Sequence, residues 1–370
     1  MIIDNARVFW EAGGFVRQKI ITEDGIISEC THDNSGFDAS GMYILPGLVD
    51  IHLHGALGYD FSDHTKEALL AIEKYETDNG ITTYLPALMT LPKEELNAAA
   101  SLARDMITPE SSISGINLEG PFLSPDRCGA QDRRNILPPD ISVFNDIMQS
   151  SCGNIKLVTV APEMPGADDF IKEVSHLTTV SIGHTAADYN TALHAFRCGA
   201  CHVTHLYNAM NDLLHRSPGV AAASFDEGAF VEIIADGNHV DPAVIRMTFA
   251  LYGDRTVLIS DSMRGTGLGD GMYTLGGQDV IKKGSRAFLA SDESVLAGSV
   301  CNLADMLQNA VKFGVDADSA VKAATINPAK SVGLEKEAGV LSIGRRADLL
   351  FTSEDFTPLY VMKNGKMKKV

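Results

Sequence analysis

Short apolar runs alternate with helix-like stretches along most of this chain, and this alternation sets the first expectation for the fold. Between residues 45 and 261 the apolar runs have the composition of β-strands. Strands that alternate with helices favour a parallel sheet with crossover helices. The expected strands are 48–54, 81–88, 114–119, 155–161, 178–183, 201–206, 230–235 and 256–261. Eight such units predict an α/β fold, a closed (β/α)8 barrel of the TIM type.

Several of the intervening helices have their own boundary signals. The helix predicted over 65–79 stops at Gly80, and the one over 188–198 stops at Gly199. The helix predicted over 92–106 has a proline in its first turn. Proline just inside the start and glycine just past the end are typical of helix termini, so these stretches fit crossovers between strands.

The two ends of the chain have a different pattern, with short strands and tight turns. Residues 15–21 and 25–30 predict strands near the start, and residues 344–351 do so near the end. The segment 361–367 contains an Asn-Gly pair, the dipeptide typical of a two-residue hairpin turn. We expect a small β-sandwich domain built from both termini, residues 1–44 and 338–370, beside a barrel of residues 45–337.

Composition and charge narrow the class of partners. The 370 residues are 45% hydrophobic and 21% charged, which is typical of a globular chain long enough to bury a barrel-sized core. The formal net charge is -18, whereas nucleic acids and anionic membrane surfaces favour clustered Lys and Arg. We therefore expect small-molecule partners, no nucleic acid and no membrane. An anionic substrate would need a local cationic pocket.

Targeting and cysteine patterns favour a cytoplasmic protein. No segment reaches the ~20 apolar residues that cross a bilayer, and residues 1–8 lack the order of a signal peptide. The six cysteines are scattered, which favours reduced thiols over a disulfide framework. Residues 198–202 match the attachment pattern for c-type haem. A helix end followed by a strand, with packed cysteines, explains that segment better.

Polar residues gather where the predicted barrel strands end. A barrel of this type places function at the carboxyl ends of its strands. His52 and His54 lie two residues apart in a strand, so both rings face one side and can hold one metal ion. At or just after the ends of other strands stand Glu119, His184, His205, His239 and Asp261. Each has a structural alternative, such as a hydrogen-bonded His or a helix-capping Asp, but their convergence on one rim favours a site.

The other histidines lie in loops, in helices or in mid-strand. We interpret as structural His32, His64, His176, His194 and His202. His215 stays open because it neighbours Arg216.

The segments around the candidate residues resemble a known family in order and spacing. Residues 45–55, Leu-Pro-Gly-Leu-Val-Asp-Ile-His-Leu-His-Gly, are similar to the opening signature of the amidohydrolase superfamily. The segments that resemble N-acetylglucosamine-6-phosphate deacetylases are 118–122, 183–185, 204–210, 216–219, 236–240, 296–299, 327–330 and 339–350. The resemblance runs nearly end to end and implies an enzyme that hydrolyses an amide.

The resemblance also implies a divalent metal centre. Glu119, His184 and His205 would hold the ion that carries the hydrolytic water. His52 and His54 would hold a second ion, with Glu119 bridging the two. Members of the family hold one or two ions, and a mixed set of histidines and carboxylate suits Zn²⁺ or Fe²⁺. The sequence leaves the identity and the number of the ions open.

Asp261 is the implied catalytic residue. An unactivated amide needs a strong nucleophile, a stabilised oxyanion and a proton for the leaving amine. A carboxylate beside the attacking water can act as general base and then return the proton to the departing nitrogen. We expect Asp261→Asn to keep the metal and to lose turnover.

The same resemblance implies a set of substrate-binding residues. They are Gln131, Asn208, Ala209, Arg216, His239, Leu296, Ala297 and Gly298. Arg216 would reach the phosphate, either within its own chain or across the interface of a homodimer. The forked donors of Arg suit this task, and a surface ion pair is the structural alternative.

Gln131 is a departure from the family pattern. Members usually have a His at this place, where it contacts the substrate amide carbonyl. Gln donates a hydrogen bond but carries no positive charge. Either metal alone stabilises the oxyanion with weak help from Gln131, or the substrate differs, for example in the sugar epimer.

The leading hypothesis for function is a metal-dependent hydrolase of amino-sugar catabolism. It would convert N-acetylglucosamine 6-phosphate to glucosamine 6-phosphate and acetate. The alternatives are a deacetylase of another N-acetylhexosamine phosphate, such as the galactosamine epimer, or a different amidohydrolase that acts on an N-acyl amine or a nucleobase. A non-catalytic relative would have lost ligands or the last Asp, and this chain keeps them all.

Overall fold

Eight parallel strands form the centre of the computed structural model, which describes residues 1–11, 14–33 and 35–370. In chain order they are β8 (Leu48–Leu53), β11 (Ile81–Leu88), β12 (Ile116–Leu118), β13 (Ile155–Val160), β14 (Thr179–Ile182), β15 (His202–Val203), β16 (Phe230–Ile234) and β17 (Thr256–Ile259). The backbone N–H of Asp261 donates to the carbonyl of His52 at 2.8 Å, which joins the last strand to the first. The predicted barrel class is confirmed, although β15 is shorter than expected.

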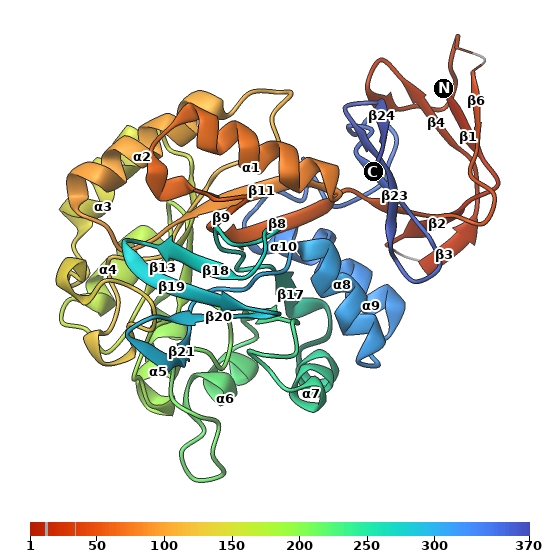
Figure 1. The fold of residues 1–370 in the computed structure, drawn as a ribbon. Coiled ribbons are helices and arrows are strands. Elements are labelled where there is room, and N and C mark those ends of the chain that lie inside the picture. The colour runs from red at the N-terminus through yellow and green to blue at the C-terminus, as the bar shows by residue number, and fades with distance from the viewer. Residues whose placement is uncertain (12–13, 34) are drawn as a thin grey trace.

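Helices surround the barrel as a ring (Figure 1). The α-helices are α1 (Lys66–Asp78), α2 (Lys93–Met106), α3 (Ile141–Ser150), α4 (Ala167–Val174), α5 (Tyr189–Cys198), α6 (Gly219–Asp226), α7 (Pro242–Tyr252), α8 (Leu303–Lys312), α9 (Ala317–Ala323) and α10 (Ile326–Ser331). Short 3₁₀ helices are η1 (Phe61–Asp63), η2 (Pro125–Arg127), η3 (Arg133–Asn135) and η4 (Gly253–Arg255). Thr65 caps α1 by accepting the Ala68 N–H at 3.2 Å.

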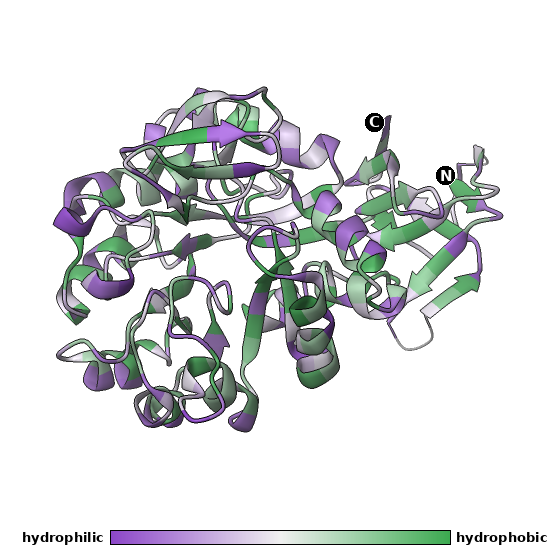
Figure 2. Ribbon diagram, turned by 60° about the horizontal axis from the view of Figure 1, so that its bottom comes forward, coloured by the Kyte–Doolittle hydropathy of each residue, from purple (hydrophilic) through white to green (hydrophobic). Residues whose placement is uncertain are grey.

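Burial explains why the barrel strands have continuous apolar sequences. Every residue of β8 and β11 is buried, because helices cover one face of the sheet and the barrel interior covers the other. Hydrophobic residues run along the strands, whereas the surrounding helices mix apolar and polar positions (Figure 2). The few polar residues that remain inside such strands therefore need a specific explanation.

Both termini contribute to two further sheets that lie beside the barrel (Figure 1). One sheet has the order β5-β4-β1-β6 and the other β24-β23-β22-β7-β2-β3. Their bounds are β1 (Ile2–Asp4), β2 (Arg7–Trp10), β3 (Gly14–Arg17), β4 (Ile20–Glu23), β5 (Ile26–Ile27), β6 (Gly36–Asp38), β7 (Tyr43–Pro46), β22 (Leu349–Thr352), β23 (Pro358–Lys363) and β24 (Lys366–Lys369). Asn364 and Gly365 form the turn between β23 and β24, as predicted.

A small core holds the terminal sheets together. Ile3, Val8, Ile44, Leu349 and Phe351 are all buried in one cluster that is separate from the barrel core. Because β7 ends only one residue before β8 begins, the terminal sheets lead directly into the first barrel strand. This short connection fixes where the chain enters the barrel.

A four-stranded antiparallel sheet between β17 and α8 was not predicted. Its strands are β18 (Gly271–Leu275), β19 (Gln278–Lys283), β20 (Arg286–Leu289) and β21 (Asp292–Leu296). Figure 1 shows this sheet in front of the barrel opening. Gly276 and Gly277 both have positive φ, the requirement of the hairpin turn that joins β18 to β19. That Gly-Gly pair between two strand-length runs was the signal in the sequence.

Three further local features concern a hairpin, the cysteines and the length of the helices. A hairpin of β9 (Gly55–Ala56) and β10 (Tyr59–Asp60) follows β8. All six cysteines are free. The segment 198–202 is the end of α5 followed by β15, as predicted, but Cys201 is exposed and Cys198 only partly buried, so the expectation of packed cysteines was wrong. None of the helices in the described ranges combines the length and apolar character needed to cross a bilayer.

Candidate metal centre

A cavity of about 390 Å³ opens at the rim where the barrel strands end. Its lining includes His54, Glu119, Gln131, His184, His205, Asn208, Ala209, His239, Asp261, Leu296 and Gly298. Ala297 is buried and packs with the residues under the unpredicted sheet. The structure therefore brings most of the candidate residues together at one opening.

The first two histidines owe their position to regular strand geometry. His52 lies on β8 and His54 directly follows the last residue of that strand, Leu53, so the alternation of the strand turns both rings to the inside of the barrel rim. A Cβ atom on Gly55 would lie 2.1 Å from the carbonyl oxygen of Tyr59. Glycine is thus required where the chain folds back directly after the histidine pair.

Three other candidates lie just beyond strand ends in an uncommon backbone conformation. The φ angles are +46° at His184, +27° at His205 and +48° at Asp261, all in the left-handed region. Non-glycine residues adopt this region at an energetic cost, and such positions cluster at functional sites. Gly183 leaves room for the turn, since a Cβ atom there would lie 2.6 Å from the Cβ of Thr204.

One carboxylate oxygen is the meeting point of two of these histidines. Oε1 of Glu119 lies 3.0 Å from Nε2 of His184 and 3.0 Å from Nε2 of His205. The two Nε2 atoms lie 3.0 Å from each other. Glu119 is buried at the end of β12, so this triangle of ligand atoms is shielded from solvent.

The other two histidines face the same carboxylate from the opposite side. Nε2 of His54 lies 3.4 Å from Oε2 of Glu119 and 3.0 Å from Oδ1 of Asp261. Nε2 of His52 lies 3.4 Å from Oε1 of Glu119. This buried Nε2 has no hydrogen-bond partner among the described residues. Glu119 therefore lies between two groups of possible metal ligands.

The hydrogen bonds behind the rings show that the ligand atoms fit a cation. Nδ1 of His184 donates to the carbonyl of Arg127 at 3.1 Å, and Nδ1 of His54 donates to the carbonyl of Ala87 at 3.1 Å. A neutral imidazole that donates through Nδ1 carries a lone pair on Nε2. Those lone pairs would face carboxylate oxygens at close range, which is repulsive unless a positive charge lies between them. The residues present therefore fit a divalent metal site.

In the metal-free chain, protons can supply part of the missing positive charge. Burial lowers the pKa of His52, but the Glu232 and Glu119 carboxylates outweigh it and raise the pKa well above its ordinary value. Burial raises the pKa of Glu119, and the surrounding histidines, His52 first, bring it well below its ordinary value. For Asp261, burial raises the pKa, but the hydrogen bond with His54 and the charges of His52 and His54 together bring it below its ordinary value. The carboxylates of the centre are thus held in the charged form that ligates metal.

Gln131 lines the cavity and also contacts Glu119 of the candidate metal centre. Its Nε2 donates to Oε2 of Glu119 at 2.6 Å, and its Oε1 accepts the backbone N–H of Thr90 at 2.7 Å. Both ends of the amide are therefore engaged, and the side chain is buried. This arrangement orients Glu119 from behind.

Three of the remaining substrate candidates, His239, Asn208 and Ala209, also line the cavity. Nδ1 of His239 donates to Oδ2 of Asp236 at 2.8 Å, which fixes the ring and turns Nε2 to the cavity. Asn208 and Ala209 lie on the loop after β15, and Ala209 has φ +50°. The hydroxyl of Tyr207 is tied to Thr248 at 3.0 Å, which anchors the same loop.

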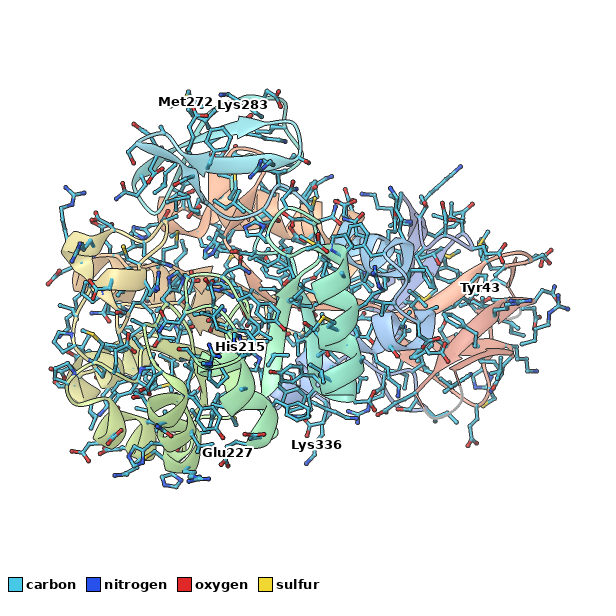
Figure 3. All side chains as sticks on the ribbon, turned by 90° about the horizontal axis from the view of Figure 1, so that it is seen from below. Tyr43, His215, Glu227, Met272, Lys283 and Lys336 are labelled. Carbon is cyan, nitrogen blue, oxygen red and sulfur yellow. The ribbon has the colours of Figure 1, made fainter. Side chains whose placement is uncertain are left out.

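Arg216 does not line the cavity of the single chain. It lies in the exposed loop of residues 211–218 between β15 and α6, which carries the exposed Leu213 and Leu214. Figure 3 looks onto the molecule from below and labels His215 of this loop. Arg127 is the cation that does line the cavity, and its guanidinium donates to Oδ1 of Asn211 at 2.7 Å.

Sequence reasoning missed three residues of this region. Glu232 lies behind His52, Asp236 lies behind His239, and Arg127 lies at the cavity. Glu232 had a visible signal, since a carboxylate in the middle of an apolar strand needs a buried partner. Arg127 had no comparable signal, because a basic residue in a loop is usually a solvated surface residue.

The sequence of this chain matches a known protein family. The model of the amidohydrolase family matches residues 43–368, which is most of the chain. The chain belongs to the amidohydrolase family. Its members therefore supply the closest chemical parallels for the ligand set described above.

Several curated relatives and solved structures are similar over most of their length. The N-acetylglucosamine-6-phosphate deacetylase of Bacillus subtilis is 35% identical over 337 residues, covering 88% of this chain and 84% of that one. The N-acetylgalactosamine-6-phosphate deacetylase of Escherichia coli O157:H7 is 30% identical, covering 93% of both chains. A mutant Mycobacterium smegmatis deacetylase, solved with N-acetyl-D-glucosamine-6-phosphate, has 31% identity and a TM-score of 0.93, covering 99% of this chain and 98% of that one.

Proposed function

We propose that this protein is a metal-dependent deacetylase that converts N-acetylglucosamine 6-phosphate to glucosamine 6-phosphate and acetate. The observation that carries the proposal is the convergence of four histidines and Asp261 on the Glu119 carboxylate at one end of a cavity. The similarity to curated deacetylases over more than four-fifths of both chains supports the same substrate class.

The proposed cofactor is Zn²⁺ or Fe²⁺, with two ions in each chain. His184 and His205 would hold one ion, His52 and His54 the other, and Glu119 would bridge them. Nitrogen and carboxylate ligands suit both metals. When bound, a divalent cation lowers the pKa of water to about 7 and polarises the acyl oxygen, so it supplies a nucleophile at neutral pH.

Asp261 is proposed to move the proton during hydrolysis. Its Oδ1 lies 3.0 Å from Nε2 of His54, at the edge of the centre that faces the cavity. As a carboxylate it would accept a proton from the attacking water. The same carboxyl group would then donate that proton to the nitrogen of the departing amino sugar, which leaves as a neutral amine.

Gln131 is proposed to position Glu119 and not to carry the oxyanion. The hydrogen bond to Oε2 of Glu119 at 2.6 Å keeps that oxygen turned toward the His54 side. Of the two explanations for this departure from the family pattern, the contacts support metal alone as the oxyanion stabiliser. Gln131 then acts through Glu119.

The sugar phosphate is proposed to bind in the same cavity as the metal centre. His239, Asn208 and Ala209 offer a ring nitrogen and a loop backbone along its lining. The leucine and glycine of the segment 296–298 border the same cavity. Arg127 gives this acidic protein a cation at the cavity, and the forked donors of Arg suit phosphate.

Arg216 is proposed to serve a second copy of the chain in a homodimer. The exposed loop 211–218 combines Arg216 with the exposed apolar side chains of Leu213 and Leu214. Apolar residues beside an Arg are a common composition for a protein interface. Sedimentation at micromolar concentration should give a dimer, and Leu213→Asp should shift it to monomer.

We further propose a cytoplasmic location, which the free thiols and a phosphorylated substrate support.

A galactosamine epimer remains a second candidate substrate. The Escherichia coli relative that carries that name covers 93% of this chain, a larger share than the Bacillus relative covers. The two sugars differ only in the orientation of one hydroxyl group, so the metal centre would act on both. Selectivity would then rest on the cavity wall.

Acetate release is the experiment that tests the proposal. Metal-reconstituted protein would be assayed with N-acetylglucosamine, its 6-phosphate, and N-acetylgalactosamine 6-phosphate. We expect turnover only with a phosphorylated sugar, and fastest with the glucosamine form. Fastest turnover of the galactosamine form would select the second candidate. Absence of turnover with both phosphates would overturn the proposed substrate class. Hydrolysis of a different N-acyl amine would then still support amide hydrolysis as the reaction.

A further inference from the structure

Glu232 is a buried carboxylate beneath the metal centre that the proposed chemistry does not use. It lies in the middle of β16, fully buried, with its side chain inside the barrel. Its Oε2 accepts from Nδ1 of His52 at 3.0 Å and from the backbone N–H of His205 at 2.9 Å. Its Oε1 lies 4.0 Å from Nδ1 of His202 and has no hydrogen-bond partner among the described residues.

The four histidines of the centre differ in what stands behind each ring. Nδ1 of His54 and Nδ1 of His184 each face a backbone carbonyl, and the buried Nδ1 of His205 has no partner in the described part of the chain. Within that same part, His52 alone of the four has a carboxylate behind Nδ1. A carboxylate behind a ligating imidazole fixes its tautomer and makes it a stronger donor to metal.

We infer that Glu232 is a positioning residue that makes the His52 side of the centre a tight metal site, so that the protein retains two ions. This inference rests on the metal centre of the proposed function. Since one oxygen also holds the N–H of His205, Glu232 ties a ligand of the first ion to a ligand of the second. The ion on the His52 side depends on Glu232 most directly, because Glu232 contacts the ring of His52 but only the backbone N–H of His205.

A purely structural role is the competing explanation. Glu232 and His52 could form a buried ion pair that stabilises the barrel whether or not metal is present. Such a pair would affect folding of the metal-free chain and leave metal affinity unchanged. The two explanations therefore differ in the number of ions held at a given free metal concentration.

The test counts metal ions in three variants at buffered free Zn²⁺. Glu232→Gln keeps the volume and one acceptor oxygen but removes the charge, and Glu232→Leu removes both. Glu76→Gln is the matched control, because Glu76 of α1 is equally buried and neither of its oxygens has a hydrogen-bond partner among the described residues. Metal content would be measured by mass spectrometry, and unfolding of each metal-free form would be measured by circular dichroism.

The expected result is two ions in the wild type and in Glu76→Gln. Glu232→Gln should need about 10–100-fold more free Zn²⁺ to take up the second ion, and Glu232→Leu should hold one. Wild-type filling of both sites in Glu232→Gln and Glu232→Leu would overturn the inference, as would a wild type that holds one ion at every concentration. Acetate release by a one-ion wild type would still leave the proposed function standing, so the two failures are distinguishable.

Discussion

The two sides of the metal centre are built in different ways, although they share Glu119. We call His184, His205 and Glu119 the loop side, and His52, His54 and Glu119 the strand side. The loop side takes its histidines from turns after β14 and β15, where both have positive φ. The strand side takes His52 from β8 and His54 from the position directly after it, two residues further along the same alternation.

This difference means that one half of the site has a regular backbone and the other half a strained one. A regular strand orients its side chains without backbone strain, so the fold alone determines where the rings of the strand side point. The loop side stores backbone strain, for which the proposed metal ligation would compensate. Loss of metal should therefore affect the loop side more than the strand side.

Removal of all metal has the largest expected effect on this comparison. Dialysis against a strong chelator should abolish acetate release, because the proposed activation of water at neutral pH depends on the metal. Hydrogen exchange should then rise in the loops after β14 and β15, and much less along β8. Activity should return with Zn²⁺ or Fe²⁺. Equal exchange on both sides would contradict the division proposed above.

Asp261→Asn has the next largest expected effect, because it removes the proposed proton carrier and keeps the proposed ligands. Asn tolerates the left-handed conformation at φ +48°, so the backbone should not change. We expect turnover to fall by about 10²–10⁴-fold with an unchanged metal count. Steady-state acetate release and metal analysis check this together. Unchanged turnover would remove Asp261 from the mechanism.

The strand side could be predicted from the sequence by periodicity alone. An inward-facing His pair follows directly from the alternation of side chains in an apolar run. The loop side needed the barrel rule, which places residues at strand ends on one rim, and that rule located Glu119, His184 and His205 correctly in space. The local sequence pattern did not predict the distances between these three side chains, because the distances depend on turns in which His184 and His205 have positive φ.

The parts that the sequence could not supply are those that depend on contacts across the barrel. Glu232 and His52 are far apart in the chain and meet only because β16 and β8 face a common interior. The sheet of β18–β21 was missed because its short strands alternate weakly and follow the last barrel strand. Gln131 was placed near the substrate by resemblance, and its bond to Glu119 required the folded chain.

His184→Asn and His52→Asn compare the two sides directly. Asn again tolerates φ +46° at position 184, so both variants lose a ring with little change in backbone. We expect His184→Asn to lose acetate release almost completely, and His52→Asn to lose one ion and retain a measurable part of the activity. Metal analysis and initial rates are the two measurements. A more damaging His52→Asn would reverse the ranking of the two sides.

Gln131→Ala should have a moderate effect, because it removes a support behind Glu119 and no ligand. Loss of the 2.6 Å bond to Oε2 should cost about 10–100-fold in metal affinity or activity. Gln131→His tests the other explanation for this departure from the family. A large gain in rate with Gln131→His would show that oxyanion stabilisation, and not the position of Glu119, limits this enzyme.

The smallest effect is expected at a third group of ligand types, on the outer helices. Asp168 of α4 and Cys198 of α5 both face Nε2 of His194, at 3.0 Å and 3.5 Å. The side chains of Asp168 and His194 are 51% and 57% exposed, so water competes for any ion, unlike at the buried centre. We expect Cys198→Ser to change neither the metal count after dialysis nor acetate release. A third ion that survives dialysis in the wild type and is lost in this variant would show that convergence of ligand atoms suffices without burial.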